Sequence, residues 1–140
     1  VGNEKIIRAL ATLKSNVDSS QFLAIQKAAA IALESDLLEV KSHCHIFEER
    51  MELLYQALTD MGLKVEKPRG TIFLWVQVPE GFTSMTFADK LLQEVGILVT
   101  PGTAFGSNGE GYVRISLSVS KERLQEVIHR LKSSKLRGGN

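Results

Sequence analysis

Cysteine is almost absent from this sequence. Cys44 is the single cysteine among 140 residues, so the chain cannot close an internal disulfide. A lone thiol is typical of proteins from a reducing compartment, which favours a cytoplasmic location. Prolines number only three and glycines eleven, and this excludes a collagen-like or low-complexity chain. The hydrophobic share of 44% and the charged share of 24% instead indicate an ordinary globular chain.

Long hydrophobic runs and an excess of one charge are missing as well. The longest apolar run covers residues 28–33, whereas a membrane-spanning helix needs about 20 apolar residues. The formal net charge is +1, so the composition offers no broad electrostatic attraction to nucleic acid or to an anionic membrane. We therefore expect neither of these as a partner.

The first part of the chain has the apolar periodicity of three helices. They are expected at residues 4–14, 19–34 and 36–61. Asp18 and Gln21 have the spacing of a capping box and are expected to open the second helix. Gly62 stands where a glycine would end the third helix.

The third helix carries one apolar seam of eight residues. Their steps alternate between three and four: Leu37, Val40, Cys44, Phe47, Met51, Leu54, Leu58 and Met61. The interpretation that we favour is a helix that buttresses a domain, with a helical dimerisation element as the alternative. Cys44 is then a core cysteine. His43 and His45 lie two residues apart, so their rings point to opposite sides of the helix and no metal site is expected.

Beyond Gly62 the apolar period changes to alternation, which predicts strands. Residues 63–67 and 71–78 are expected to form a hairpin, and the second strand is apolar on both faces, which predicts a central position. A helix over residues 84–95, strands at 97–100 and 112–118, and a last helix capped by Ser120 follow. The fold class is therefore α/β, with a mainly antiparallel sheet and helices packed against it.

The glycine-rich stretch 102–111 invites a comparison with phosphate-binding loops. Such loops lead into a helix N-terminus, and the Walker type also needs a lysine. Here a strand follows, and no lysine lies between Lys90 and Lys121. We interpret the stretch as a long connection between strands, of a length that is more often functional than not.

Arg114 is the sharpest single candidate for function. Alternation along the last strand places Val113, Ile115 and Leu117 on one face and Arg114 on the other. A guanidinium within a sheet needs a planar anion opposite it, and its rigid fork fits a carboxylate. Two hypotheses follow from the pattern: a ligand carboxylate, or a structural ion pair with a glutamate of the same chain.

Several segments of the chain resemble the class I/II aminotransferases, which are pyridoxal-phosphate enzymes of fold type I. The strongest is Val-Thr-Pro-Gly-Thr-Ala-Phe-Gly at residues 99–106, followed by Gly-Glu-Gly-Tyr-Val-Arg-Ile-Ser-Leu at 109–117. Three further segments resemble the family, at residues 14–22, 25–29 and 68–75, and they follow one another along the chain in the family's order. Residues 1–3 resemble the end of the stretch that follows the family's cofactor lysine.

The resemblance implies a role for Arg114, namely binding of the α-carboxylate of the amino-acid substrate. It also implies what this chain lacks. None of its ten lysines matches the family's Schiff-base lysine motif, so no residue of the chain is expected to be catalytic or to bind the cofactor. We expect the C-terminal part of an aminotransferase, inactive by itself, whose intact form uses pyridoxal 5'-phosphate to move an amino group between an amino acid and a 2-oxo acid.

By the same resemblance, residues 1–34 are a remnant of the large cofactor-binding domain. Residues 35–140 form the long linking helix and the C-terminal small domain. The expected partners are the rest of the enzyme chain and a second subunit in a homodimer. The substrates that the resemblance favours are LL-diaminopimelate, aspartate or alanine, with a glutamate/2-oxoglutarate pair. A non-catalytic amino-acid-binding module, which also needs a carboxylate-binding arginine, is the remaining alternative.

Overall fold

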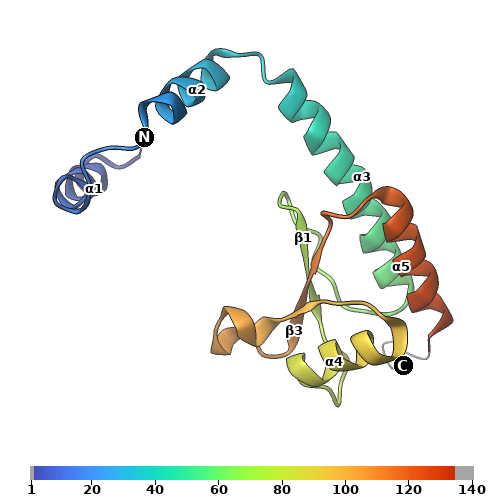
Figure 1. The fold of residues 1–140 in the computed structure, drawn as a ribbon. Coiled ribbons are helices and arrows are strands. Elements are labelled where there is room, and N and C mark those ends of the chain that lie inside the picture. Colours follow the sequence, from blue (N-terminus) through green and yellow to red (C-terminus); the bar gives the residue numbers. More distant parts are fainter. Residues whose placement is uncertain (1, 135–140) are drawn as a thin grey trace. The chain divides into compact units, whose positions relative to one another are not determined.

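The computed structural model describes residues 2–134 of the chain (Figure 1). By its internal contacts the chain divides into two compact units, residues Val1–Val40 and Lys41–Asn140. The assignment of residues 1–34 to a larger cofactor domain stays a prediction.

The first unit contains two amphipathic helices, α1 (Glu4–Val17) and α2 (Leu23–Glu34). Asn3 caps α1, because its side-chain oxygen accepts hydrogen bonds from the amides of the first turn. The expected capping box at the start of the second helix is wrong. Asp18 instead ends α1 and pairs with Lys14, so α2 begins only at Leu23, with no side-chain cap.

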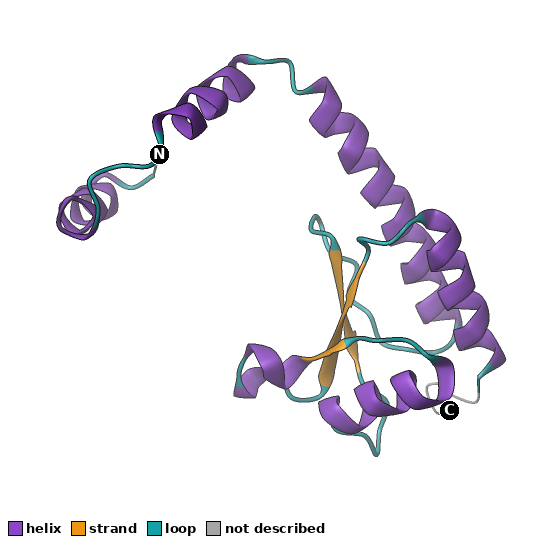
Figure 2. Ribbon diagram, in the orientation of Figure 1, coloured by secondary structure: helices purple, strands orange, loops and turns teal. Residues whose placement is uncertain are grey.

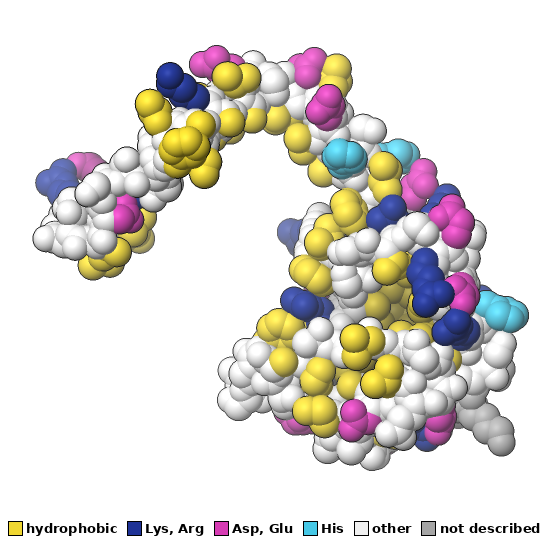
Figure 3. Space-filling model, viewed as in Figure 1, with side chains coloured by type: hydrophobic (Ala, Val, Ile, Leu, Met, Phe, Trp, Pro, Cys, Tyr) yellow, Lys and Arg dark blue, Asp and Glu magenta, His cyan; other side chains and the backbone are white. Residues whose placement is uncertain are grey.

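Neither helix of the first unit buries a side chain among the described residues. Apolar side chains such as Ile6, Leu10, Leu13 and Phe22 are exposed. Figure 3 shows hydrophobic side chains on the surface of this part of the chain. The two helices expected over residues 4–14 and 19–34 are confirmed, although α1 ends three residues later and α2 begins four residues later than expected. Within the described residues their apolar side chains have no core to join.

Helix α3 (Leu38–Asp60) is the longest element and ends as the sequence predicts. Gly62 takes φ +80°, a left-handed conformation that favours glycine. The amide of Leu63 donates to the carbonyl of Leu58 at 3.0 Å, which is the bond that closes a Schellman motif. This turn sends the chain back towards the sheet.

The apolar seam of α3 is buried along only half of its length. Met51, Leu54, Leu58 and Met61 are buried, whereas Leu37, Val40 and Cys44 are exposed. The expectation of a core cysteine is therefore wrong. Its physical reason is that the packed core reaches only the C-terminal half of the helix, so the periodicity of the first half has no packed counterpart among the described residues.

Three antiparallel strands form the sheet: β1 (Phe73–Gln77), β2 (Thr100–Pro101) and β3 (Tyr112–Ser116) (Figure 2). Their order is β1-β3-β2, so the central strand is β3 and not β1 as expected. The expected strand at 63–67 is reduced to a single antiparallel bridge between Val65 and Val76. An α/β fold with an antiparallel sheet is confirmed.

Two further helices complete the second unit. Thr83 opens α4 (Ser84–Lys90) with a capping box, and the helix continues as one turn of π-helix over Leu91–Val95. Ser120 caps α5 (Lys121–Ser133), as predicted. Gly96, at φ +68°, ends the π-helical turn where the sequence predicts a stop.

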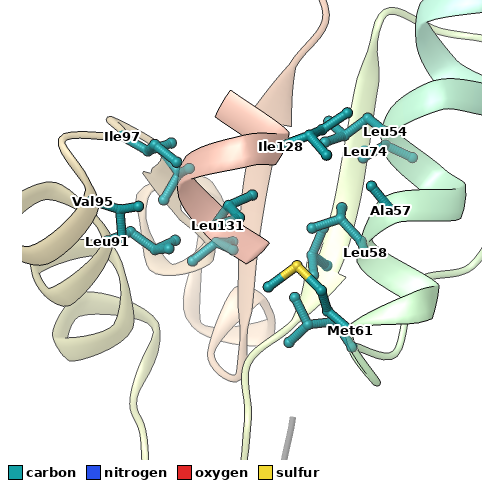
Figure 4. Packing of buried hydrophobic residues seen from close by; sticks show 14 of the residues in the cluster. Leu54, Ala57, Leu58, Met61, Leu74, Leu91, Val95, Ile97, Ile128 and Leu131 are labelled. Carbon is teal, nitrogen blue, oxygen red and sulfur yellow. The ribbon is translucent and has the colours of Figure 1, made fainter. Parts of the chain in front are cut away.

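The core lies on one face of the sheet, beneath α3, α4 and α5. Leu74, Val76 and Val113 are at most 1% exposed and supply the strand side of this core. Figure 4 shows the packing of the side chains that α3, α5 and the π-helical turn supply, together with Met61 directly after α3: Leu54, Ala57, Leu58, Met61, Leu91, Val95, Ile128 and Leu131. Because all three helices cover this face, the side chains on the other face of the sheet are available for a site.

Candidate functional site

Arg114 lies in the middle of the central strand and on the face of the sheet opposite the core. Its neighbour Val113 is fully buried, whereas Arg114 is half-buried, as strand alternation requires. The pairing register sets Arg114 opposite Trp75 on β1 and opposite Thr100 on β2. The central strand thus holds the guanidinium between two neighbouring strands.

Two phenylalanine rings lie against this guanidinium. The Cζ atom of Arg114 is 4.1 Å from the centre of the Phe73 ring and 4.5 Å from the centre of the Phe105 ring. Such distances are typical of cation–π contacts, in which the negative face of a ring attracts the cation. Phe73 comes from β1, and Phe105 comes from the glycine-rich stretch that precedes β3.

Trp75 and Tyr112 add two more aromatic rings to the same face. Their centres are 5.6 Å apart with an interplanar angle of 18°, so the rings are stacked. Trp75 also meets the ring of Phe105 edge to face, with the centres 5.8 Å apart. The arginine therefore lies within a cluster of four rings, which we call the aromatic cluster: Phe73, Trp75, Phe105 and Tyr112.

An open groove of about 1210 Å³ runs along this face of the sheet. Its lining includes Arg114 and three members of the aromatic cluster, together with Tyr55 of α3 and the segment 63–69. Lys67, in that segment, binds Glu52 of α3 at 2.5 Å, and this hydrogen bond raises the pKa of Lys67. The groove is large enough for a small organic substrate.

No carboxylate within residues 2–134 forms an ion pair with Arg114, and no hydrogen bond engages its N–H groups there. Of the two hypotheses for Arg114, the ion pair with a glutamate of the same chain is therefore absent from the described residues. The guanidinium lines the groove with its donors unengaged by these residues. A planar anion such as a carboxylate could bind there with two parallel hydrogen bonds.

A buried serine anchors the end of the glycine-rich stretch. Ser84 is 0% exposed, and its Oγ accepts from the amides of Gly111 at 2.9 Å and Tyr112 at 3.2 Å while donating to the carbonyl of Gly109. Its own amide donates to the carboxylate of Glu110 at 2.9 Å. This backbone hydrogen bond is the main reason that the pKa of Glu110 lies below its ordinary value.

Neither the aromatic cluster nor the hydrogen bonds of Ser84 to Gly109, Gly111 and Tyr112, which we call the clamp of Ser84, were predicted from the sequence. Strand alternation over 71–78 could have placed Phe73 and Trp75 on the same face, and antiparallel pairing could then have set them near Arg114. A strand that is apolar on both faces predicts a central strand buried on both sides, so this pattern does not mark Phe73 and Trp75 as residues of a site. For Ser84 the sequence offers no signal beyond its place at the start of a helix.

The segment His43–His45 forms no metal centre with other described residues. Cys44 and both histidines are exposed. His45 lies near two glutamates of the same helix: its Nδ1 atom is 3.6 Å from Glu48 Oε2, and its Nε2 atom is 3.4 Å from Glu49 Oε1. Within residues 2–134 no group of three or more potential ligand side chains comes together. Nor does that part of the chain contain a helix both long and apolar enough to cross a bilayer.

Comparison with known proteins gives a consistent result. The family model "Aminotransferase class I and II" matches residues 1–131. The chain is 44% identical over 136 residues to an LL-diaminopimelate aminotransferase of Aquifex aeolicus, which covers 97% of this chain and 35% of that protein. It is 42% identical over 134 residues to a protein of the same name from Moorella thermoacetica.

Solved structures agree with the sequence comparison. The chain matches substrate-bound BacF from Bacillus subtilis with a TM-score of 0.82 and 38% identity, covering 100% of this chain and 36% of that one. Aspartate aminotransferase of Thermotoga maritima matches with a TM-score of 0.78 and 31% identity, and the match covers 94% of this chain and 33% of that one. The chain thus spans about a third of the length of the relatives that it matches.

Proposed function

Since the chain belongs to the class I and II aminotransferase family, we propose that it is part of an enzyme that transfers an amino group between an amino acid and a 2-oxo acid. The expectation of a C-terminal part, inactive by itself, belongs to this proposal. So do a cytoplasmic location and a homodimer as the working form of the intact enzyme.

The observation that carries the proposal is the setting of Arg114. Its guanidinium lines an open groove, touches two rings, and has no hydrogen-bonding partner within residues 2–134. Every amino acid and 2-oxo acid carries a carboxylate next to the reacting carbon. The fork of Arg114 is suited to that carboxylate, because two parallel N–H donors match its two oxygens.

Binding the carboxylate would also orient the substrate. With the carboxylate fixed by two hydrogen bonds, rotation about the bond to Cα is restricted, and the Cα–H bond is held in one direction. Such orientation lowers the entropic part of the barrier to deprotonation. The walls of the groove, Trp75 and Tyr112 among them, would exclude water from one side of the bound carboxylate and so strengthen its interaction with Arg114.

The family uses pyridoxal 5'-phosphate, which supplies an electron sink for the carbanion at Cα. The described residues near Arg114 do not fit this cofactor. Arg114 is surrounded by aromatic rings, the groove lining contains no aspartate to pair with a pyridine nitrogen, and none of the ten lysines matches the family's lysine motif. We assign the cofactor's binding residues to the part of the relatives that this chain does not span.

The domain assignment follows the same proposal. Residues 1–34 would belong to the large cofactor domain, and residues 35–140 would form the linking helix and the small domain. The exposed apolar faces of α1 and α2 agree with helices that pack elsewhere in a larger enzyme. Among substrates, LL-diaminopimelate with 2-oxoglutarate is the first pair to test, because several relatives bear that substrate in their names. Aspartate and alanine are the next.

One assay separates this proposal from its alternatives. The 140-residue chain and an enzyme of the relatives' full length that contains it are each supplied with pyridoxal 5'-phosphate, LL-diaminopimelate and 2-oxoglutarate, and glutamate is measured. We expect glutamate from the full-length enzyme alone. Tight binding of free amino acids by the 140-residue chain would favour the amino-acid-binding module. Self-association through α3 without any transfer in the full-length enzyme would favour the dimerisation element.

A further inference from the structure

We infer that Phe73 and Phe105 are positioning residues that hold the guanidinium of Arg114 ready for a carboxylate. This inference rests on the proposed function and adds the residues that prepare its binding site. It begins with an unusual combination: the cation is in contact with two rings, while none of its N–H groups is hydrogen-bonded within residues 2–134.

The way in which an arginine is held decides what it can still bind. A carboxylate or carbonyl partner fixes a guanidinium by occupying its N–H donors, and it thereby competes with a ligand. Aromatic rings interact with the face of the planar group and leave the donors at its edge free. The contacts of Phe73 and Phe105 thus restrict the orientation of Arg114 without consuming the donors that a carboxylate needs.

The two rings come from parts of the fold that are anchored separately. Phe73 lies in β1, paired with Ser116 of β3, two residues beyond Arg114 on the same strand. Phe105 ends a 3₁₀ turn that begins at Gly102. The glycine-rich stretch is fixed further along by the clamp of Ser84. The path of the glycine-rich stretch therefore places Phe105 against the guanidinium.

A side chain that is already oriented loses less freedom when a ligand binds. Arginine has one of the largest side-chain conformational entropies, so ordering it beforehand lowers the cost of binding. Because all substrates share the carboxylate, loss of a ring should weaken the binding of every amino acid and 2-oxo acid by a similar factor. Loss of a residue that contacts the substrate's side chain would instead change the order of affinities among the different substrates.

Phe105 is the better residue to change, because it is 52% exposed and its loss leaves the core intact. Phe105→Leu removes the ring, and Phe105→Tyr keeps it. Phe82→Leu is the matched control. Its ring also contacts a cation, with Lys90 Nζ 5.1 Å from the ring centre, but that cation is not Arg114, and the ring packs against Phe87 of α4.

The first measurement uses the 140-residue chain and does not depend on catalysis. The nitrogen–proton NMR signal of the Arg114 side chain is assigned by its disappearance in Arg114→Lys. We expect Phe105→Leu to shift this signal and to increase side-chain mobility, because a ring face no longer lies against the guanidinium. Phe105→Tyr and Phe82→Leu should leave it nearly unchanged. An Arg114 signal that is the same with and without the ring overturns the inference.

The second measurement uses the full-length enzyme with its cofactor. We expect Phe105→Leu to raise KM by about 2- to 30-fold for amino acid and 2-oxo acid alike, with a smaller change in kcat. Phe105→Tyr should restore most of the loss. An unchanged KM, or a change confined to one substrate, contradicts the inference. If the NMR result is as expected but Arg114→Lys leaves catalysis intact, the proposed function fails and the contact between ring and arginine stands.

Discussion

The backbone of Gly102, which begins the glycine-rich stretch 102–111, lies in direct contact with the backbone of Gly109 near the end of that stretch. A Cβ atom on either residue would overlap the carbonyl oxygen of the other, and at Gly102 it would also come within 2.8 Å of the carbonyl oxygen of Tyr112. Both residues are buried. This approach closes the loop that brings Phe105 to Arg114, and only glycine allows it.

Gly102→Ala should therefore destabilise the second unit. The clash is with backbone atoms, which cannot move aside as a flexible side chain can, so we expect a loss of at least about 2 kcal/mol in the free energy of unfolding. Urea unfolding followed by the fluorescence of Trp75, the single tryptophan, measures it. Gly70→Ala is the matched control, since a Cβ there meets nothing within 4 Å, and it should change stability by less than about 1 kcal/mol.

The buried half of the α3 seam gives a second prediction. Leu54 is 0% exposed, so Leu54→Ala should lower the free energy of unfolding by about 2–5 kcal/mol through lost burial and a remaining cavity. Ile46→Ala, on the same helix at a position 41% exposed, should cost less than about 1 kcal/mol. Equal effects at both positions would mean that the core does not extend over α3 as described.

The exposed half of the same seam predicts thiol reactivity. Because Cys44 is exposed, a thiol reagent should label the folded chain at a rate within roughly tenfold of the unfolded chain. Stopped-flow labelling in buffer and in denaturant compares the two rates. Protection by several orders of magnitude would show that a partner or a second copy of the chain covers this part of α3 in solution.

Glu110 gives a prediction about pH. Its pKa is lowered, chiefly by the hydrogen bond from the Ser84 amide, so the folded state favours the charged carboxylate. That contribution to stability is complete above the ordinary Glu pKa of 4.5 and is lost as the pH falls through the lower folded value. Wild type should exceed Glu110→Gln in urea midpoint at pH 7, and the difference should shrink steadily below about pH 4.5.

A control for this titration is Glu80→Gln. Glu80 is exposed, and its side chain makes no hydrogen bond within the described residues. Its replacement should leave the urea midpoint nearly unchanged across the same pH range. A difference between wild type and Glu110→Gln that stays constant from pH 7 to pH 3 would contradict the role assigned to the Glu110 carboxylate.

Periodicity predicted the elements of this fold better than their packing. The ends of α3 and of the π-helical turn followed from Gly62 and Gly96, since a left-handed residue ends a helix by local chemistry alone. The environment of β1 did not follow, because apolar residues on both faces fit two arrangements: a strand that is buried on both faces, or a strand with one face in the core and the other lining a groove. Tertiary pairing decides between them, and it is not encoded locally.

The candidate site divides in the same way. Strand alternation alone placed Arg114 on the face away from the core, because a period of two leaves no other choice. The contacts of Phe73 and Phe105 depend on the register between β1 and β3 and on the path of a long loop. Cys44 shows what apolar periodicity does not predict. A regular seam indicates which residues share one face of a helix, but it does not indicate how far the core extends along that face.

The central claim is that Arg114 binds the substrate carboxylate, and the most direct test is Arg114→Lys in the full-length enzyme. Lysine keeps the charge but loses the planar fork, so kcat/KM for amino acid and 2-oxo acid should fall by roughly 30- to 4,000-fold, the equivalent of about 2–5 kcal/mol. Cofactor binding and the melting temperature should change little. Wild-type kcat/KM together with a much lower melting temperature would show that Arg114 serves the fold and would contradict the account.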